Sequence, residues 1–162
     1  MKNLYLIRHA QKNQEENILD DFDMPLTSLG EKQANNLGKN INELSLKPDL
    51  FISSPALRAK STALLIAKQI DYKKEIIYNE NIYKAHMSEL QEIVSYTYDE
   101  VENLFLVGHN PSLTALLLHL TNFKEKFTMS SFACIEFSCS SWIEISPSNA
   151  KLKMLIKNQL DF

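Results

Sequence analysis

Short runs of uninterrupted apolar residues place the strongest constraint on how this chain folds. Residues 4–7 and 104–107 are entirely apolar, and residues 50–53 are apolar up to a final serine. A strand with one wet face alternates polar and apolar side chains, whereas a strand covered on both faces does not. The three runs therefore predict short strands inside a sheet that has helices on both sides.

Helix signals follow the first two predicted strands. Ser28 and Glu31 form a capping-box pattern in front of an amphipathic helix that ends near residue 44. Ser54 and Pro55 are typical of an N-cap and the first residue of a helix, here one that reaches about residue 70. The chain thus begins in the order strand, helix, strand, helix.

The alternation continues through the next segment. Residues 75–78 predict another strand, and Ser88 with Gln91 forms a second capping-box pattern before a helix. After the run that ends at residue 107, Asn110 and Pro111 are typical of the N-cap and first residue of a helix through residue 120. Strands that alternate with helices in this way form mostly parallel sheets.

The C-terminal part of the chain has a different pattern. Short strands are predicted at residues 132–137, 142–145 and 151–157, the last with alternating lysines. We expect these strands at an edge of the sheet. The predicted fold class is therefore α/β, with three α/β/α layers, a mostly parallel central sheet and antiparallel edge strands near the C-terminus.

Length, composition and charge exclude several classes of protein. The 162 residues suit one domain, expected over residues 1–162, and the net charge of −3 offers no general attraction to nucleic acid or an anionic membrane. The apolar runs are far shorter than the ~20 residues that span a bilayer, and no signal peptide precedes Arg8. The two cysteines form neither a paired metal motif nor a disulfide framework. A cytoplasmic location is therefore expected.

Glycine is scarce in this chain. It occurs only at Gly30, Gly38 and Gly108, whereas an average protein contains ~7% glycine. Each of the three is therefore expected to serve a need of the backbone. Gly108 in particular is expected to let the chain turn sharply before the next residue.

Charged residues follow the ends of the predicted strands. The first strand ends in Arg8 and His9, Arg58 comes in the first helical turn after the second, and His109 follows residues 104–107. Taken singly, each is more often a solvated or capping residue. Ligands in open α/β sheets, however, bind outside the carboxyl ends of the parallel strands. Two arginines, two histidines and two helix N-termini would meet there, which favours an anion such as phosphate.

The remaining histidines and motifs suggest no second site. His86 has no comparable context, and His119 lies within an apolar helical pattern, where a half-buried histidine is expected. The sequence has no zinc-protease motif, calcium loop, P-loop or dinucleotide fingerprint. We therefore expect no metal and no cofactor.

Four ordered motifs span nearly the whole chain. They are Leu-Ile-Arg-His-Ala at residues 6–10, Pro-Leu-Thr-x-x-Gly at 25–30, Ser-Ser-Pro-x-x-Arg-Ala-x-x-Thr-Ala at 53–63 and Val-Gly-His-Asn-Pro at 107–111. With these motifs the chain resembles the histidine phosphatase superfamily, which includes phosphoglycerate mutases and acid phosphatases. It is most similar to the compact SixA-like phosphohistidine phosphatase branch. The resemblance implies a phosphoglycerate mutase-like fold.

The resemblance also implies roles for the residues at the strand ends. His9 is the nucleophile that becomes phosphorylated, and Arg8, Arg58 and a protonated His109 hold the phosphoryl oxygens. Ala10 stands where the wider superfamily commonly has glycine. Larger members insert a segment that covers the substrate between the second arginine and the second histidine. Only fifty residues separate these two positions here, so an open and shallow site is expected.

The general acid is the catalytic group that the sequence defines least. Glu80 follows the strand predicted at residues 75–78, at roughly the position of the superfamily's acidic residue. The alternative is an ordinary exposed glutamate in a loop. A phosphoramidate needs less help from an acid, because a protonated imidazole leaves readily and an alkoxide does not. An open site with a doubtful acid therefore favours phosphohistidine over sugar phosphates.

The preferred interpretation is a metal-independent phosphohistidine phosphatase that forms a covalent phosphohistidine intermediate. Its partner would be a phosphorylated protein, for example a histidine-containing phosphotransfer domain, and not nucleic acid or a membrane. The first alternative is a small-molecule phosphomonoesterase that acts on a small phosphate ester. A non-catalytic phosphate-binding module is more remote. In the polar loop at residues 11–23, Lys12 and Asn13 are candidate substrate contacts, with a solvated loop as the alternative.

Overall fold

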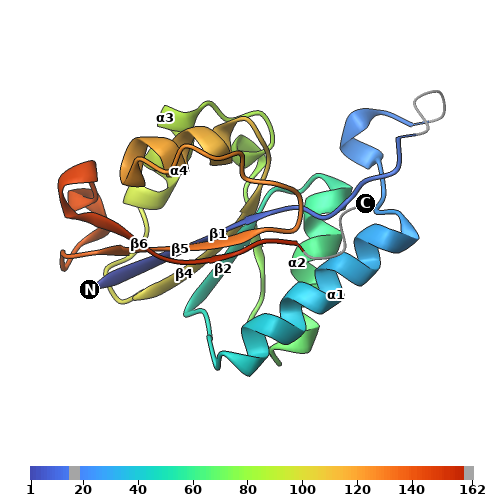
Figure 1. The fold of residues 1–162 in the computed structure, drawn as a ribbon, viewed down its shortest axis with the longest axis horizontal. Helices are drawn as coiled ribbons and strands as arrows, with labels where there is room; N and C mark the ends of the chain where they lie inside the picture. Colours follow the sequence, from blue (N-terminus) through green and yellow to red (C-terminus); the bar gives the residue numbers. More distant parts are fainter. Residues whose placement is uncertain (15–18, 159–162) are drawn as a thin grey trace.

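The computed structural model describes residues 1–14 and 19–158, which form a sheet of six strands between two helical layers (Figure 1). The strands are β1 (Lys2–Arg8), β2 (Leu50–Ser53), β3 (Ile77–Tyr78), β4 (Asn103–Gly108), β5 (Phe132–Phe137) and β6 (Ala150–Ile156). The main helices are α1 (Ser28–Glu43), α2 (Leu57–Gln69), α3 (Met87–Ser95) and α4 (Ser112–Thr121). Short 3₁₀ helices are η1 (Asp21–Asp23), η2 (Glu80–Ile82), η3 (Trp142–Glu144) and η4 (Pro147–Asn149).

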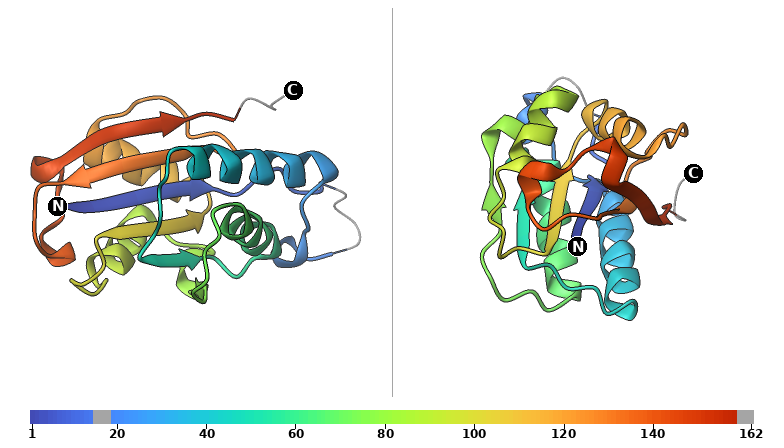
Figure 2. Two further views of the ribbon diagram at one scale, coloured as in Figure 1. Left: turned by 90° about the horizontal axis from the view of Figure 1, so that it is seen from below. Right: turned by 90° about the vertical axis from the view of Figure 1, so that its left-hand side faces the viewer.

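The sheet has the strand order β3-β2-β4-β1-β5-β6. The pairs β2–β3, β2–β4 and β1–β4 are parallel, whereas β5 is antiparallel to β1 and β6 is antiparallel to β5. The left view of Figure 2 shows β6, β5, β1, β4 and β2 side by side. The predicted fold class is confirmed, including the antiparallel edge near the C-terminus.

The continuous apolar runs are explained by two separate hydrophobic cores. Leu4 and Leu6 of β1 pack in the core beneath α3 and α4, whereas Tyr5 and Ile7 pack in the core against α1 and α2. Figure 1 shows these two helix pairs on opposite sides of the sheet. Since successive side chains of a strand point to opposite faces, both sets must be apolar.

Two helices begin at other residues than the sequence predicts. The N-cap of α1 is Thr27 and not Ser28, because the Thr27 hydroxyl accepts a hydrogen bond from the Gly30 N–H at 2.9 Å. The N-cap of α3 is His86 and not Ser88, and the Glu89 carboxylate accepts from the His86 N–H at 3.3 Å. In α1 a side chain closer to the start of the segment takes up a free backbone N–H, whereas in α3 the Glu89 side chain reaches back to the N–H of the N-cap residue.

The starts of α2 and α4 also differ in detail. Helix α2 begins two residues after Pro55, since the Ser54 hydroxyl accepts from the Ala56 N–H at 3.2 Å and forms a turn before the helix. The N-cap of α4 is Pro111 and not Asn110, although the Asn110 side chain accepts from the Thr114 N–H at 3.1 Å. Pro111 therefore precedes the first helical residue.

The strand predicted at residues 142–145 is wrong, because the chain forms the 3₁₀ helix η3 there. Trp142 and Ile145 are buried, while Ile143 between them is exposed. A spacing of three residues between buried side chains suits a 3₁₀ turn. The indole N–H of Trp142 also donates to the Val101 carbonyl at 2.7 Å.

The half-buried position expected for His119 is wrong as well, since this side chain is exposed. The buried stripe of α4 is formed by Leu113, Leu116, Leu117 and Leu120. These positions follow the helical spacing of three and four residues, and His119 lies beside that stripe. None of the helices in the described part of the chain combines the length and hydropathy that crossing a bilayer requires.

Gly30 and Gly38 serve close packing and not unusual backbone angles. None of the three has a positive φ, so the sharp turn expected at Gly108 is wrong. A Cβ at Gly30 would lie 2.1 Å from the Gln11 carbonyl oxygen, and one at Gly38 would lie 2.7 Å from the Gln69 Cβ. At Gly108 the nearest atom would be 3.4 Å away, which is ordinary contact.

We predict that Gly30→Ala lowers the free energy of unfolding by about 1–3 kcal/mol, because the new methyl group forces the backbone near Gln11 to move. Gly108→Ala is the matched control and should change the value by less than about 1 kcal/mol. Urea denaturation of both variants measures the difference. Equal effects of the two substitutions would contradict the close approach of α1 to the chain after β1.

Candidate active site

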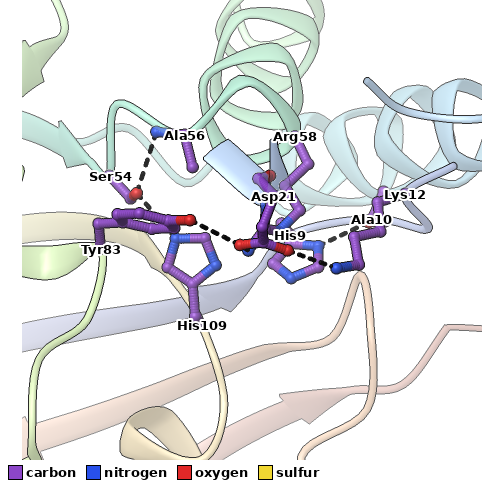
Figure 3. A network of polar contacts seen from close by, with 9 residues as sticks. All are labelled: His9, Ala10, Lys12, Asp21, Ser54, Ala56, Arg58, Tyr83 and His109. Carbon is purple, nitrogen blue, oxygen red and sulfur yellow. Dashed lines mark hydrogen bonds and ion pairs between the residues drawn. The ribbon is translucent and has the colours of Figure 1, made fainter. Parts of the chain in front are cut away.

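The carboxyl ends of β1, β2 and β4 lie at one edge of the sheet because these strands are parallel. The His9 N–H donates to the Gly108 carbonyl at 3.3 Å, and the Ser54 N–H donates to the Val107 carbonyl at 3.0 Å. His9 and His109 therefore emerge from neighbouring strands, and Figure 3 shows their rings together with Arg58. The two imidazole centroids are 5.2 Å apart.

His9 is held as a neutral imidazole with one free nitrogen. Its side chain is 5% exposed, and Nδ1 lies 2.7 Å from the Ala10 carbonyl oxygen. A carbonyl can only accept, so Nδ1 carries the proton and Nε2 keeps its lone pair. Burial first, and then the positive charges of the neighbouring histidine and arginines, lower the pKa of His9 to about 3, although the Ala10 hydrogen bond opposes this shift.

The backbone around His9 is fixed by hydrogen bonds from two other segments. The Thr62 hydroxyl accepts from the Ala10 N–H at 3.0 Å and donates to the Arg58 carbonyl at 2.7 Å. On the other side, the Ser130 N–H lies 3.0 Å from the Arg8 carbonyl and 3.1 Å from the His9 carbonyl. These contacts hold the imidazole in one orientation.

His109 directs a nitrogen without a protein partner into the same region. Its Nε2 lies 2.7 Å from the Ser54 hydroxyl, which itself accepts from the Ala56 N–H. In the tautomer in which the Ser54 hydroxyl donates to Nε2, the proton of the neutral ring is on Nδ1. Burial, followed by the charge of Arg58, lowers the pKa of His109 to about 4. With this pKa the ring is neutral at pH 7 while no phosphoryl group is bound; the protonated form expected in contact with phosphoryl oxygens stays a prediction.

The two arginines use only part of their hydrogen-bonding capacity. Arg8 donates through Nη1 to the Phe127 carbonyl at 3.3 Å, and burial lowers its pKa. Arg58 is buried, and it donates through Nη1 to the Asp21 carbonyl at 2.7 Å and through Nη2 to the Asp21 carboxylate at 3.0 Å. The Nε atoms of both arginines are buried without a partner.

Unpartnered donors are concentrated at this edge of the sheet. Four buried side-chain polar atoms in residues 1–14 and 19–158 have no hydrogen-bond partner: Nε of Arg8, Nε of Arg58, Nδ1 of His109 and Oγ of Ser130. Leaving a buried donor unpaired costs about 1–3 kcal/mol. Three nitrogen donors beside the free Nε2 of His9 suit a ligand with several acceptor oxygens, and a phosphoryl group provides three.

Asp21 and Tyr83 belong to this site, although the sequence analysis did not identify them. The Asp21 carboxylate accepts from Lys12 at 2.7 Å and from the Tyr83 hydroxyl at 2.6 Å, in addition to Arg58 (Figure 3). The bonds to Lys12 and Tyr83, and then to Arg58, hold the pKa of Asp21 well below its usual range. Nothing in the local sequence distinguishes Asp21 from the acidic residues beside it, and Tyr83 lies 62 residues further along the chain.

Glu80 comes two residues after the carboxyl end of β3, which runs parallel to β2. Glu80 is the exposed first residue of η2. A pocket of about 340 Å³ opens beside Arg58 and His109, and its wall includes Tyr83 and His86 but not Glu80. His9 does not line this pocket either, so the role of Glu80 as general acid stays a prediction.

The loop at residues 11–23 is described except for residues 15–18, which lie outside the described residues. Lys12 forms an ion pair with Asp21, and the Asn13 N–H donates to the Pro25 carbonyl at 2.7 Å. Their predicted contact with substrate stays a prediction. In the part of the chain that the structure describes, no group of three or more histidine, cysteine or acidic side chains could hold a metal ion.

The sequence matches the profile of the histidine phosphatase superfamily, branch 1, over residues 4–100. This match covers more than half of the chain and includes Arg8, His9 and Arg58. The chain belongs to the histidine phosphatase superfamily. His109 lies beyond the matched residues, so its place in the site rests on the geometry described above.

The chain is also similar to individual proteins and to solved structures. An uncharacterized chloroplastic protein of Arabidopsis thaliana is 25% identical over 96% of this chain and 77% of its own length. The mitochondrial serine/threonine-protein phosphatase Pgam5 of Drosophila simulans is 38% identical over 48% of this chain, which spans only 26% of that protein. A structure assigned to the phosphohistidine phosphatase SixA of Agrobacterium tumefaciens has the same fold, with a TM-score of 0.84, 23% identity and coverage of 96% and 97% of the two chains.

We predict that His9 makes the protein less stable as the pH falls from 7 to 5. The unfolded chain takes up a proton at His9 near pH 6.5, whereas the folded chain, with a pKa of about 3, does not. The free energy of unfolding should therefore fall by about 2 kcal/mol over this range because of His9 alone.

Urea denaturation at the two pH values tests this prediction. His9→Gln should lose about 2 kcal/mol less than the wild type between pH 7 and pH 5. His119→Gln removes an exposed histidine and should lose as much as the wild type. Equal losses for the wild type and His9→Gln would mean that His9 is not buried in its neutral form.

Proposed function

We propose that this chain, as a single domain over residues 1–162, is a metal-independent phosphohistidine phosphatase that acts on a phosphorylated protein. One observation carries the proposal: the neutral, buried His9 has a free Nε2 beside the unpartnered N–H donors of Arg8, Arg58 and His109. The imidazole can act as a nucleophile, and the N–H groups beside it can donate hydrogen bonds to phosphoryl oxygens. Membership of the histidine phosphatase superfamily supports the same chemistry.

In the first step, the lone pair of His9 Nε2 attacks phosphorus in line with the bond to the substrate imidazole. The new P–N bond forms as the old one breaks, and the electron pair returns to the substrate ring. If the other nitrogen of that ring carries a proton, the ring leaves as neutral imidazole. Arg8, Arg58 and the Nδ1–H of His109 stabilise the charge on the three equatorial oxygens.

In the second step, water attacks the phosphorus of phosphorylated His9. The P–N bond breaks, its electron pair returns to His9 Nε2, and the proton of the water passes to the released phosphate. The low pKa of His9 favours this return, because the ring leaves as a weak base. Fixed protein donors supply the charge stabilisation in both steps, so neither step needs a metal or a cofactor.

The leaving group is the reason to prefer phosphohistidine. An alkoxide must receive a proton as it leaves, whereas a protonated imidazole ring need not. Asp21 is the carboxylate at the pocket, but its bonds to Lys12, Tyr83 and Arg58 keep it ionised. Glu80 is exposed and outside the pocket. Among the described residues, no carboxyl group that lines this pocket is in a form that can give a proton to an ester.

A protein substrate is favoured by the short connection between Arg58 and His109, which holds η2 and α3 but no long covering insertion. The name of the Pgam5 relatives also refers to phosphorylated proteins. A histidine-containing phosphotransfer domain is one such substrate. Because that name refers to serine and threonine esters, a phosphomonoesterase is the second candidate, and its substrates would include small phosphate esters.

We predict that the protein releases phosphate from a phosphohistidine-bearing protein in the presence of EDTA, and that His9→Ala abolishes the release. The reason is that no other neutral nitrogen has the position of His9 Nε2. The measurement is inorganic phosphate formed from phosphohistidine protein and from an aryl phosphate, each with wild type and variant. Release that survives His9→Ala, or that EDTA stops, would contradict the proposal.

Glu80→Gln in the same assay separates the two candidate substrates. Because Glu80 is exposed and away from the pocket, the variant should keep its activity on phosphohistidine within about twofold. A wild type that prefers the aryl ester, together with a loss on that ester alone in Glu80→Gln, would establish the phosphomonoesterase. Phosphoprotein binding that depends on Arg8 and Arg58 without any turnover would establish a binding module.

A further inference from the structure

We call the pocket of about 340 Å³ beside Arg58 and His109 the phosphate pocket. A second and larger hollow lies near it. Its volume is about 610 Å³, and it opens between the β2–β3 edge of the sheet and α3. Its floor contains Leu50, Ile52 and Ile77, and its far wall contains Tyr96 and Tyr98. None of these residues takes part in the chemistry at His9, so the hollow needs its own explanation.

The hollow exists because the helical layer ends before the sheet does. Strand β3 has two residues and α3 has nine, and α3 packs mainly against α4. Ile52 and Ile77 are register partners of neighbouring strands, so they share one face of the sheet. Ile77 is 46% exposed on that face. Tyr96 and Tyr98, at 70% and 78%, are among the most exposed large side chains of the described residues.

The rim of this hollow is acidic. Glu89 and Glu92 of α3 line it, and among the described residues neither forms an ion pair. Between residues 85 and 103 the sequence contains five acidic residues and no lysine or arginine. An apolar floor with aromatic and acidic walls is complementary to an apolar side chain flanked by lysine or arginine.

The hollow and the phosphate pocket are lined by residues close together in the chain. Asn81 lines the hollow, whereas Tyr83 lines the phosphate pocket. Because Asn81 and Tyr83 are two residues apart in the chain, their Cα atoms are separated by at most about 7 Å. The phosphate pocket presents Lys84 and Arg58 to its ligand, and the hollow presents glutamates. One bound chain can therefore place a phosphoryl group in the first and a basic segment in the second.

We propose that this hollow is the docking surface for the phosphorylated protein substrate, and that it binds a segment of that substrate in which apolar residues are flanked by lysine or arginine. The proposal rests on the proposed function, since it assigns the substrate of the same active site. It explains why an acidic, aromatic surface lies a few residues from an anion pocket. The basic phosphate pocket attracts the phosphoryl group and the acidic hollow attracts the basic segment. These two attractions favour one orientation of the substrate on the protein.

Synthetic peptides with one phosphohistidine test the proposal. A Leu-Arg-Lys-Leu segment is placed three, six or nine residues to either side of the phosphohistidine, and in the matched peptides glutamate replaces arginine and lysine. At 50 mM salt, at least one basic peptide should have a kcat/KM at least fivefold above that of its acidic counterpart. The advantage should disappear at 0.5 M salt, because the attraction between exposed charges is screened.

Variants locate the effect. Glu92→Lys and Tyr98→Ala should each reduce the advantage of the basic peptide at least threefold through a higher KM, and each should leave turnover of an aryl phosphate within about twofold. Glu43→Lys is the matched control, because it makes the same change in charge at an exposed position at the end of α1. Equal kcat/KM for basic and acidic peptides at every spacing would overturn the proposal, as would an advantage that Glu92→Lys and Glu43→Lys reduce equally.

A binding measurement separates this proposal from the proposed function. Fluorescence anisotropy follows the binding of the labelled Leu-Arg-Lys-Leu peptides without phosphate to the wild type and to Glu92→Lys. If no phosphohistidine substrate is turned over, binding that Glu92→Lys weakens at least threefold still supports the docking surface, while the proposed function fails. If turnover occurs and neither measurement responds to these variants, the docking surface fails and the proposed function stands.

Discussion

The parallel pairing of β1 with β4 is the constraint on which the candidate site depends. The register places Arg8 opposite Gly108, so His9 and His109 are the first residues after the two paired strands. Their rings lie 5.2 Å apart for this reason. A slip of one residue would move His9 away from His109 and would also exchange the two faces of β1, each of which is buried in a different core. The cores beneath α1–α2 and α3–α4 therefore hold the register, and the register holds the two histidines.

Burial then determines what these histidines can do. It lowers the pKa of His9 to about 3 and that of His109 to about 4, so that both rings are neutral at pH 7. A neutral His9 can act as a nucleophile, and a neutral His109 still donates through Nδ1. The positive charge needed for a phosphoryl group comes from the arginines, whose charge persists despite burial. Asp21 balances part of that charge and fixes two of the Arg58 nitrogens while Nε stays free.

The sequence predicted the parts of the structure that depend on local pattern. The apolar runs identified β1, β2 and β4, and the residues directly after these strands and in the next helical turn included Arg8, His9, Arg58 and His109. Cap positions were less predictable, because several neighbouring polar residues compete for the same backbone groups, as Thr27 and Ser28 do. Asp21 and Tyr83 could not be predicted, since they reach the site through contacts between distant segments. For Glu80 the sequence offered a general acid or an exposed loop glutamate, and its exposure in η2 matches the second description.

The central claim is that His9 Nε2 forms a covalent bond to phosphorus, and locating that bond tests it most directly. The wild type is mixed with a phosphohistidine peptide, quenched in alkali within milliseconds, digested, and sequenced by tandem mass spectrometry under conditions that preserve P–N bonds. The account predicts a phosphoryl group on His9 that rises and decays as phosphate is released, with none on His109. Phosphate release without any phosphorylated His9, or a phosphoryl group on another residue with the same time course, would contradict it.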